Sequence, residues 1–297
     1  MLQVSALSGV PSEIRATAFL ALPLVIGHVC AGLIAFVDNL IAGNHGTDTL
    51  AAVTLGTALL WLPMLVPIGI LIALTASVAR LYGAERLKEI APVFRQALWL
   101  ALFMGLFMFG FLSLAPALLA PAGIAEEMIP GAQAFLYAVR WGSPALTVFF
   151  CMRYLCEGMH WMRPTMLFSF GGLLVLAPLG YVLTNGKLGF PELGAQGLGI
   201  ASAIMMWLQA LFFAFYLWRS KRMAHLQLFA RFDRPRLGCI TDLLKTGMPI
   251  GIAILMQGSL FIVTSLLIGR LGSTVLAAHQ IAVNLAQLCF MIPVAVA

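Results

Sequence analysis

A single carboxylate inside an apolar stretch is the residue whose chemistry stands out. Asp38 lies in the run AFVDNLI at positions 35–41. A charged group within a membrane costs about 2.5 kcal/mol or more on insertion scales, so its presence points to function. Such a carboxylate can take up a proton or a cation, and Asp38 is therefore our candidate coupling residue for Na⁺ or H⁺. The alternative is a helix-end carboxylate near the outer interface, since Gly43 follows closely.

Amide side chains form a second group of candidates. Asn39 follows Asp38 directly, and Gln257 lies in a later apolar stretch. Gln280 and Asn284 recur at helical spacing in the last stretch, together with Gln287. Amides at such positions either bond to a neighbouring helix or line a cavity, and the sequence leaves both interpretations open. Asn39, Gln257, Gln280 and Asn284 are therefore our candidates for lining a cavity.

Other polar residues favour structural roles. Arg153 and Glu157 are four residues apart, and we expect an ion pair on the surface of a helix. Arg140 is expected to extend its side chain towards the outer interface, and His28 and His279 to be hydrogen-bonded packing residues. None of the five cysteines has the spacing of a metal site, so we expect no metal and no cofactor beyond the coupling ion.

The composition indicates that the segments that carry these residues are surrounded mainly by lipid. Apolar residues make up 62% of the chain and charged residues 9%, whereas soluble domains carry about 25% charged residues. Because about 20 apolar residues cross a bilayer, the sequence predicts an all-α, multi-pass membrane protein with eight spans. The expected spans are 16–43, 51–82, 91–120, 130–156, 164–185, 196–218, 243–270 and 275 onward.

Basic residues are concentrated in alternate loops and predict the orientation. The loops after spans two, four and six carry most of the Lys and Arg residues, whereas the other loops are nearly free of them. The positive-inside rule therefore places the N-terminus and these loops in the cytoplasm. Since the basic residues form no patch with interleaved aromatic residues, we expect no nucleic-acid partner despite the net charge of +6.

An internal repeat relates the start of the chain to its end. A shift of 226 residues, the separation of Pro23 and Pro249, aligns without gaps a further proline pair and three glycine pairs. These are Pro67 with Pro293, Gly32 with Gly258, Gly43 with Gly269 and Gly46 with Gly272. The shift covers six spans, so the copies run parallel. We expect a six-helix lobe at 1–225 and an incomplete second lobe at 226–297, eight of twelve helices in all.

Several segments resemble the multidrug and toxic compound extrusion (MATE) family of the bacterial NorM type. They are FVD at 36–38, CEG at 156–158, RPT at 163–165, GKLG at 186–189, PELG at 191–194, GMPI at 247–250 and AAHQ at 277–280. The resemblance implies twelve helices in two lobes around a cavity, and antiport of bulky, often cationic compounds against Na⁺ or H⁺. Asp38 matches the first-helix aspartate of the family. The chain departs from the family at Gln257, where a glutamate is usual, and at Leu176 and Gly180, where the family has asparagines.

We expect a monomer in the bacterial inner membrane, and our hypothesis for its mechanism is alternating access. One alternative is a flippase for lipid-linked precursors or polysaccharides, although the basic residues lie in loops rather than in spans. Another is a fragment that is inactive by itself. An intramembrane enzyme would need a nucleophile and a base in register, and Asp38 has no ionisable partner of that kind. We therefore expect no enzymatic activity.

Overall fold

The computed structural model describes the backbone of residues 10–296 except 122, 221, 222, 224, 225, 227 and 230–232. Within its helices, the side chains of 10–25, 28, 31, 287, 288 and 290–296 also lie outside the described part, which includes those of His28 and Gln287. The described residues form helices and turns, without a strand. The expected all-α fold is confirmed.

In the described part of the chain, long helical segments lie in the ranges of the expected spans. They are α1 (Val10–His45), α2 (Thr47–Gly83), α3 (Ile90–Leu114), the pair α5 (Ile129–Val139) and α6 (Ser143–Gly158), α7 (Arg163–Asn185), α8 (Gly194–Arg219), α10 (Leu237–Ile268) and α11 (Ser273–Val296). Among the fully described residues, 6 helices are long and apolar enough to cross a membrane. Parts of α1 and α11 lie outside the fully described residues. A short helix, α4 (Pro116–Leu119), continues α3.

The fourth span is interrupted, whereas the sequence predicted one continuous segment. A 3₁₀ turn at Arg140–Gly142 separates α5 from α6. Pro144 explains the break, because a proline has no N–H to donate to the carbonyl four residues earlier, at Arg140. The backbone N–H of Ser143 donates to that carbonyl instead, together with the hydroxyl of the same residue at 2.7 Å. The turn therefore keeps its backbone satisfied within the apolar layer.

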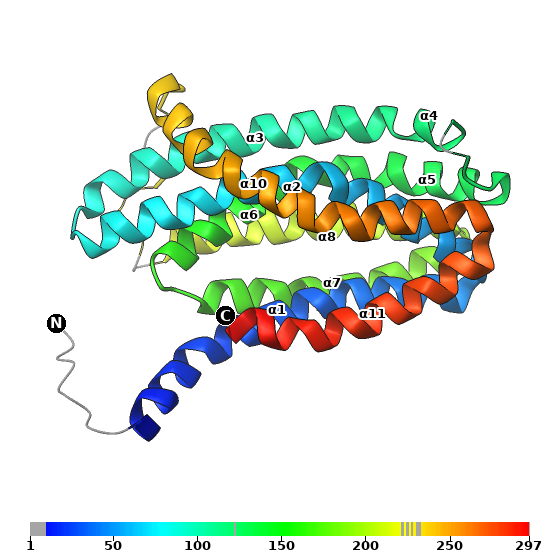
Figure 1. Cartoon of the computed structure of the whole chain (residues 1–297), viewed down its shortest axis with the longest axis horizontal. Coiled ribbons are helices and arrows are strands. Elements are labelled where there is room, and N and C mark those ends of the chain that lie inside the picture. The colour runs from blue at the N-terminus through cyan, green and yellow to red at the C-terminus, as the bar shows by residue number, and fades with distance from the viewer. Residues whose placement is uncertain are drawn as a thin grey trace.

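The helices are arranged in two layers around α2. Helices α1, α7 and α11 lie side by side in one layer, and α3, α5, α6 and α8 form most of the other (Figure 1). Helix α2 contacts α10 most extensively and also α6, α3, α5 and α11. Its side chains Leu55, Met64 and Leu74 are fully buried, which marks it as the centre of the core. Helix α7 joins the layers by packing on α8.

Glycines bring α2 and α10 into backbone contact. A Cβ atom on Gly69 would collide with the backbone of Gly251, and one on Gly247 would collide with Ile70. Small residues at such positions allow two helices to approach closely when lipid gives no hydrophobic driving force between them. This contact therefore depends on shape rather than on polar groups.

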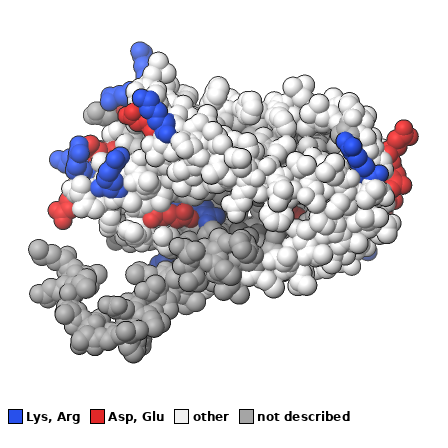
Figure 2. All heavy atoms as spheres, in the orientation of Figure 1, with Lys and Arg blue, Asp and Glu red and all other residues white. Residues whose placement is uncertain are grey.

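Charged side chains gather at the two ends of the molecule. On the face shown in Figure 2, Lys, Arg, Asp and Glu cluster at the ends, and an almost uncharged surface lies between them. More basic residues occupy the end at which α3 and α10 begin. This distribution agrees with a multi-pass membrane protein, whose charged groups remain outside the hydrocarbon layer.

Candidate functional site

Asp38 lies on the face of α1 that packs against α7. Gly27 on this face packs against the backbone of Met166 of α7, and Ile41 contacts Gly180 of α7. Residues 27, 34, 38, 41 and 45 recur at the spacing of one helix face, so the carboxyl group of Asp38 points to the same neighbour. It lies seven residues, about 10 Å, before the end of α1 at His45.

Three helices meet one turn from Asp38. The site of a Cβ on Gly180 would be 3.2 Å from Ile41 of α1 and 3.0 Å from Leu198 of α8. Ser202 is one turn beyond Leu198 on the same face of α8, just as Asp38 is one turn before Ile41 on α1. Helical geometry therefore brings the carboxyl of Asp38 and the hydroxyl of Ser202 to one junction.

Buried polar atoms without hydrogen-bond partners concentrate on these three helices. Five such side-chain atoms occur among the described residues. Four of them belong to Asp38 on α1, Thr165 and Thr184 on α7, and Ser202 on α8. Thr165 and Thr184 are 19 residues, about 28 Å, apart on α7 and therefore do not share one site. Since buried polar groups are normally paired, the carboxyl of Asp38 and the hydroxyl of Ser202 at one junction form the candidate site for a proton, a water molecule or an ion. Sequence reasoning missed Ser202 and Thr184, because an isolated hydroxyl in a membrane helix normally bonds to its own backbone.

Three of the expected amides form one cluster between α1 and α11. The amide nitrogens of Asn39 and Gln280 both donate to Oδ1 of Asn284, each at 3.1 Å. Asn39 also donates to the carbonyl of Ala35 at 2.9 Å. Asn284 is buried, with 6% of its surface exposed. The cluster lies next to Asp38 along α1, and it links the first six spans to the last.

Gln257 lies apart from this cluster. It is an exposed residue of α10, whose main contact is with α2. Thr264, the residue that the repeat aligns with Asp38, is also exposed and donates to the carbonyl of Leu260 in its own helix at 2.7 Å. The described residues therefore place acidic and amide groups together at α1 but not at α10.

A polar clasp closes the junction at the end of α1. Nε2 of His45 lies 2.9 Å from a carboxylate oxygen of Glu192, in the loop before α8. Nδ1 of the same ring lies 2.8 Å from the hydroxyl of Thr49 on α2. These contacts fix the end of α1 beside α2 and α8, about 10 Å from Asp38.

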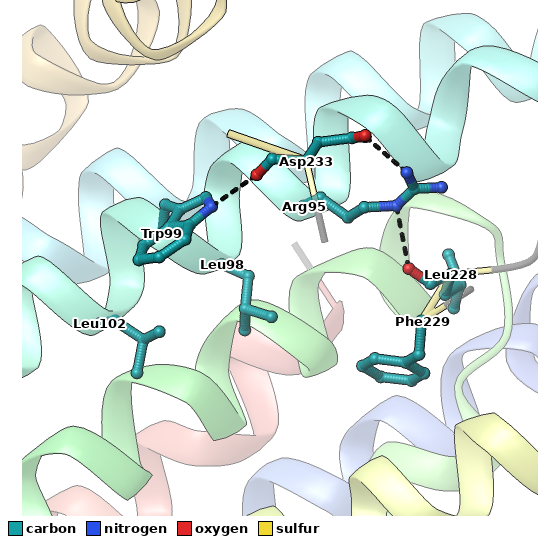
Figure 3. Close-up of a pocket in the computed structure, with 7 residues that line it drawn as sticks. All are labelled: Arg95, Leu98, Trp99, Leu102, Leu228, Phe229 and Asp233. Carbon is teal, nitrogen blue, oxygen red and sulfur yellow. Dashed lines mark hydrogen bonds and ion pairs between the residues drawn. The ribbon is translucent and has the colours of Figure 1, made fainter. Parts of the chain in front are cut away.

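A second polar region holds the segment before α10 against α3. Arg95 donates to the carboxylate of Asp233 and to the carbonyl of Leu228, and Trp99 donates to the carbonyl of Asp233 (Figure 3). Gln96 accepts from the backbone N–H of Arg236 at 2.6 Å. The pocket between them measures about 60 Å³. Because its polar groups bond to one another and its volume is well below the range of about 300–1,000 Å³ that is typical of ligand sites, the region is an anchor rather than a ligand site.

The expected ion pair of α6 exists, but it is not on the surface. Arg153 lies 2.6 Å from Glu157, and their side chains are 8% and 14% exposed. The spacing correctly predicted the pair, whereas its burial follows from packing of α6 on α2, α3 and α8. The guanidinium also lies over the ring of Phe150. Because the pair is buried, replacing only one of the two residues would leave an unpaired buried charge and destabilise the protein.

Comparison with known proteins identifies the family to which the chain is similar. The sequence profile of the MatE family matches residues 23–182. A "Probable multidrug resistance protein NorM" of Xanthomonas axonopodis pv. citri is 69% identical over 293 residues, which is 99% of this chain and 64% of that protein. The "Multidrug resistance protein NorM" of Vibrio cholerae is 36% identical over 278 residues, 93% of this chain and 61% of that protein.

A solved structure extends the comparison to three dimensions. The fold matches a structure of the "MATE transporter NorM-NG", in complex with a monobody, with a TM-score of 0.73 and 30% identity, covering 98% of this chain and 63% of that one. The chain thus spans less than two thirds of the length of these relatives, which are named as transporters or resistance proteins and not as enzymes. The expected resemblance is confirmed, and the chain belongs to the MATE family.

Proposed function

We propose that this chain is the part of a multidrug exporter that couples cation entry to the export of bulky, often cationic compounds. The observation that carries the proposal is the position of Asp38. Its buried Oδ1 has no hydrogen-bond partner, and the next residue, Asn39, bonds to Asn284 of α11. An ionisable group therefore lies beside a contact between the two ends of the chain. The relatives named as multidrug resistance proteins support the same function.

Asp38 would act by binding Na⁺ or H⁺ at the junction of α1, α7 and α8. A carboxylate in an apolar interior is unfavourable while charged and unpaired, so neutralisation by either ion stabilises the packed junction. The hydroxyl of Ser202 offers a further oxygen at the same junction. The sequence and the geometry are compatible with both ions.

Alternating access would follow from the effect of this ion on α1. Binding to one conformation in preference to the other shifts the population of the two. Asn39 moves with Asp38 because they are adjacent on one helix, and Asn39 contacts α11. Ion release and drug binding would then favour the conformation in which this interhelix contact is rearranged.

The flippase alternative has less support from the site. A cavity for lipid-linked anionic precursors would be basic, whereas the residues brought together here are one acid and neutral amides and hydroxyls. We further propose, from the loop charges, that the N-terminus lies in the cytoplasm. That the protein is a monomer of the inner membrane remains a proposal as well. Residues 1–225 and 226–297 remain our proposed division into lobes.

The test replaces Asp38 by Asn in the complete transporter. Because the amide cannot be protonated or neutralise a cation, we expect dye efflux from cells to fall and to lose its dependence on the Na⁺ or H⁺ gradient. Asp48→Asn is the matched control, since Asp48 is exposed in the first turn of α2. Measuring efflux with and without Na⁺, and with and without a protonophore, separates the ions. Unchanged efflux and ion dependence in Asp38→Asn would exclude this coupling role.

A further inference from the structure

Arg140 carries a positive charge on the outside of the bundle, away from Asp38. It belongs to the 3₁₀ turn between α5 and α6, and its Nη1 donates to the hydroxyl of Ser113 at 3.1 Å. Ser113 precedes the last residue of α3. A helix of 25 residues is about 37 Å long and exceeds the hydrocarbon thickness of about 30 Å. The side chain of Arg140 therefore extends from the turn within the apolar layer towards the end of α3, in the direction of the lipid headgroups at that end.

Three aromatic rings surround this guanidinium. Its carbon lies 5.0 Å from the ring centre of Tyr137, 5.3 Å from that of Phe109 and 5.7 Å from that of Trp141. Such contacts hold a guanidinium in a fixed orientation without neutralising its charge. Trp141 also packs edge-on against Phe109, at 5.0 Å between centres. The arrangement is a preformed cationic site with aromatic walls.

The hydrogen-bonding capacity of Arg140 is largely unused. A guanidinium carries five N–H donors, and in the described part of the chain Arg140 uses one towards Ser113. Its Nε is buried and has no partner. No carboxylate of the described residues pairs with it, in contrast to Arg86, Arg95 and Arg153. An anion with several acceptor oxygens would complement both the charge and the donors.

An apolar groove continues from the same aromatic side chains. It measures about 510 Å³ and is lined from α5 and the following turn by Tyr137 and Trp141, and from α8 by Gln196, Ile204 and Trp207 among others. Trp207 is held across the groove, because its Nε1 donates to the carbonyl of Trp141 at 2.8 Å. The volume is in the range of about 300–1,000 Å³ that is typical of ligand sites. Trp141 and Tyr137 thus belong both to the groove and to the surroundings of Arg140.

We propose that Arg140 and this groove form a binding site for an anionic phospholipid. The phosphate is bound by the guanidinium of Arg140, and an acyl chain occupies the groove between α5 and α8. The net charge of the lipid headgroup determines which phospholipids we expect the site to prefer. Phosphatidylglycerol brings an uncompensated negative charge to an uncompensated guanidinium, whereas phosphatidylethanolamine carries its own ammonium group. The site is independent of the transport role of Asp38.

Native mass spectrometry of the complete purified transporter tests the site. The protein is equilibrated with equal amounts of phosphatidylglycerol and phosphatidylethanolamine, and the retained lipids are counted at rising collision energy. We expect the wild type to retain phosphatidylglycerol preferentially, and Arg140→Gln to lower that preference about tenfold or more, the usual scale for a charge-assisted hydrogen bond. Arg270→Gln is the matched control, since Arg270 lies at the same end beside the turn at Gly123.

A second variant addresses the groove without touching the charge. Ile204→Trp places a larger side chain in the groove, and we expect it to reduce retention of two-chain phosphatidylglycerol while the protein stays folded. If Arg140→Gln does not fold, Ile204→Trp still tests the binding site. Equal retention of both lipids by the wild type would overturn the proposal. So would an unchanged preference in both variants, or an equal loss in Arg270→Gln.

Discussion

The hydrogen bond between Asn39 and Asn284 gives the sharpest test of the energetic coupling between α1 and α11. We consider the single variants Asn39→Ala and Asn284→Ala and their combination in the complete transporter. The Asn39 amide donates to Asn284 at 3.1 Å and also to the carbonyl of Ala35 at 2.9 Å. Loss of Asn284 therefore leaves Asn39 with one of its two partners, and the penalty for an unpaired donor is only partial.

The expected energy follows from these contacts. Hydrogen bonds between membrane helices contribute about 0.6 kcal/mol on average and up to about 1.7 kcal/mol. Asn284 is 6% exposed, which favours the upper part of that range, and the second bond of Asn39 favours the lower part. We expect a coupling energy of about 1 kcal/mol between the two positions. At about 1.4 kcal/mol per factor of ten, this changes a conformational equilibrium about fivefold.

A double-mutant cycle measures this coupling directly. Unfolding free energies of the wild type, both single variants and the double variant are determined in mixed detergent micelles. Gln257→Ala is the control, because this amide is exposed on α10 and outside the cluster. Independent sites are additive within about 0.3–0.5 kcal/mol. A coupling energy below that limit would refute the idea that this bond holds α1 against α11.

Three further predictions concern stability at other positions. Glu157→Gln leaves a buried arginine partly unpaired and should destabilise the protein by about 3 kcal/mol, whereas Glu89→Gln, in an exposed pair, should cost less than about 1 kcal/mol in the same denaturation assay. Gly251→Ala should destabilise the contact of α10 with α2, because the added Cβ would be 2.9 Å from a carbonyl oxygen; Gly238→Ala meets nothing and should stabilise α10 by up to about 1 kcal/mol. Arg95→Ala should speed hydrogen exchange and proteolysis of the segment before α10 without changing the exchange of α7, and unchanged rates would contradict its anchoring role.

The helices themselves could be predicted from the sequence because lipid imposes a strict condition. Every backbone polar group in the hydrocarbon layer needs a partner within its own segment, so an apolar stretch of sufficient length is a helix. The described spans follow the expected ranges for this reason. The break at Arg140–Gly142 was not predicted. Pro144 was visible in the sequence, but whether a proline bends a helix or breaks it depends on the groups that replace its missing bond, here the backbone N–H and the hydroxyl of Ser143.

The site was less predictable because its members come from distant parts of the chain. Asp38 could be recognised by its charge alone, and the amides of α11 by their spacing. Ser202 gave no such signal, since only the packing of α1, α7 and α8 leaves its hydroxyl buried and unpaired. The burial of the Arg153–Glu157 pair likewise comes from neighbouring helices that local spacing cannot reveal.

The internal repeat relates two of the contacts between helices in the structure. The shift of 226 residues pairs α1 with α10 and α2 with α11, and the structure joins α1 to α11 and α2 to α10. The two contacts are thus counterparts of each other, as a parallel repeat requires. Their chemistry nevertheless differs, and the difference can be followed residue by residue.

At the contact of α1 with α11, Asn39 of α1 donates to Asn284 of α11, and Gln280 donates to Asn284 within α11. Their aligned counterparts at the contact of α2 with α10 are Ser265, Thr54 and Ala58. Both hydroxyls there bond within their own helix, Ser265 to Phe261 and Thr54 to Leu50. A polar contact can exchange its partners when the charge of Asp38 changes, whereas a contact of glycines and self-satisfied hydroxyls has no polar bond to exchange. On the proposed coupling role of Asp38, ion binding would act on the polar α1–α11 contact beside it and not on the α2–α10 contact.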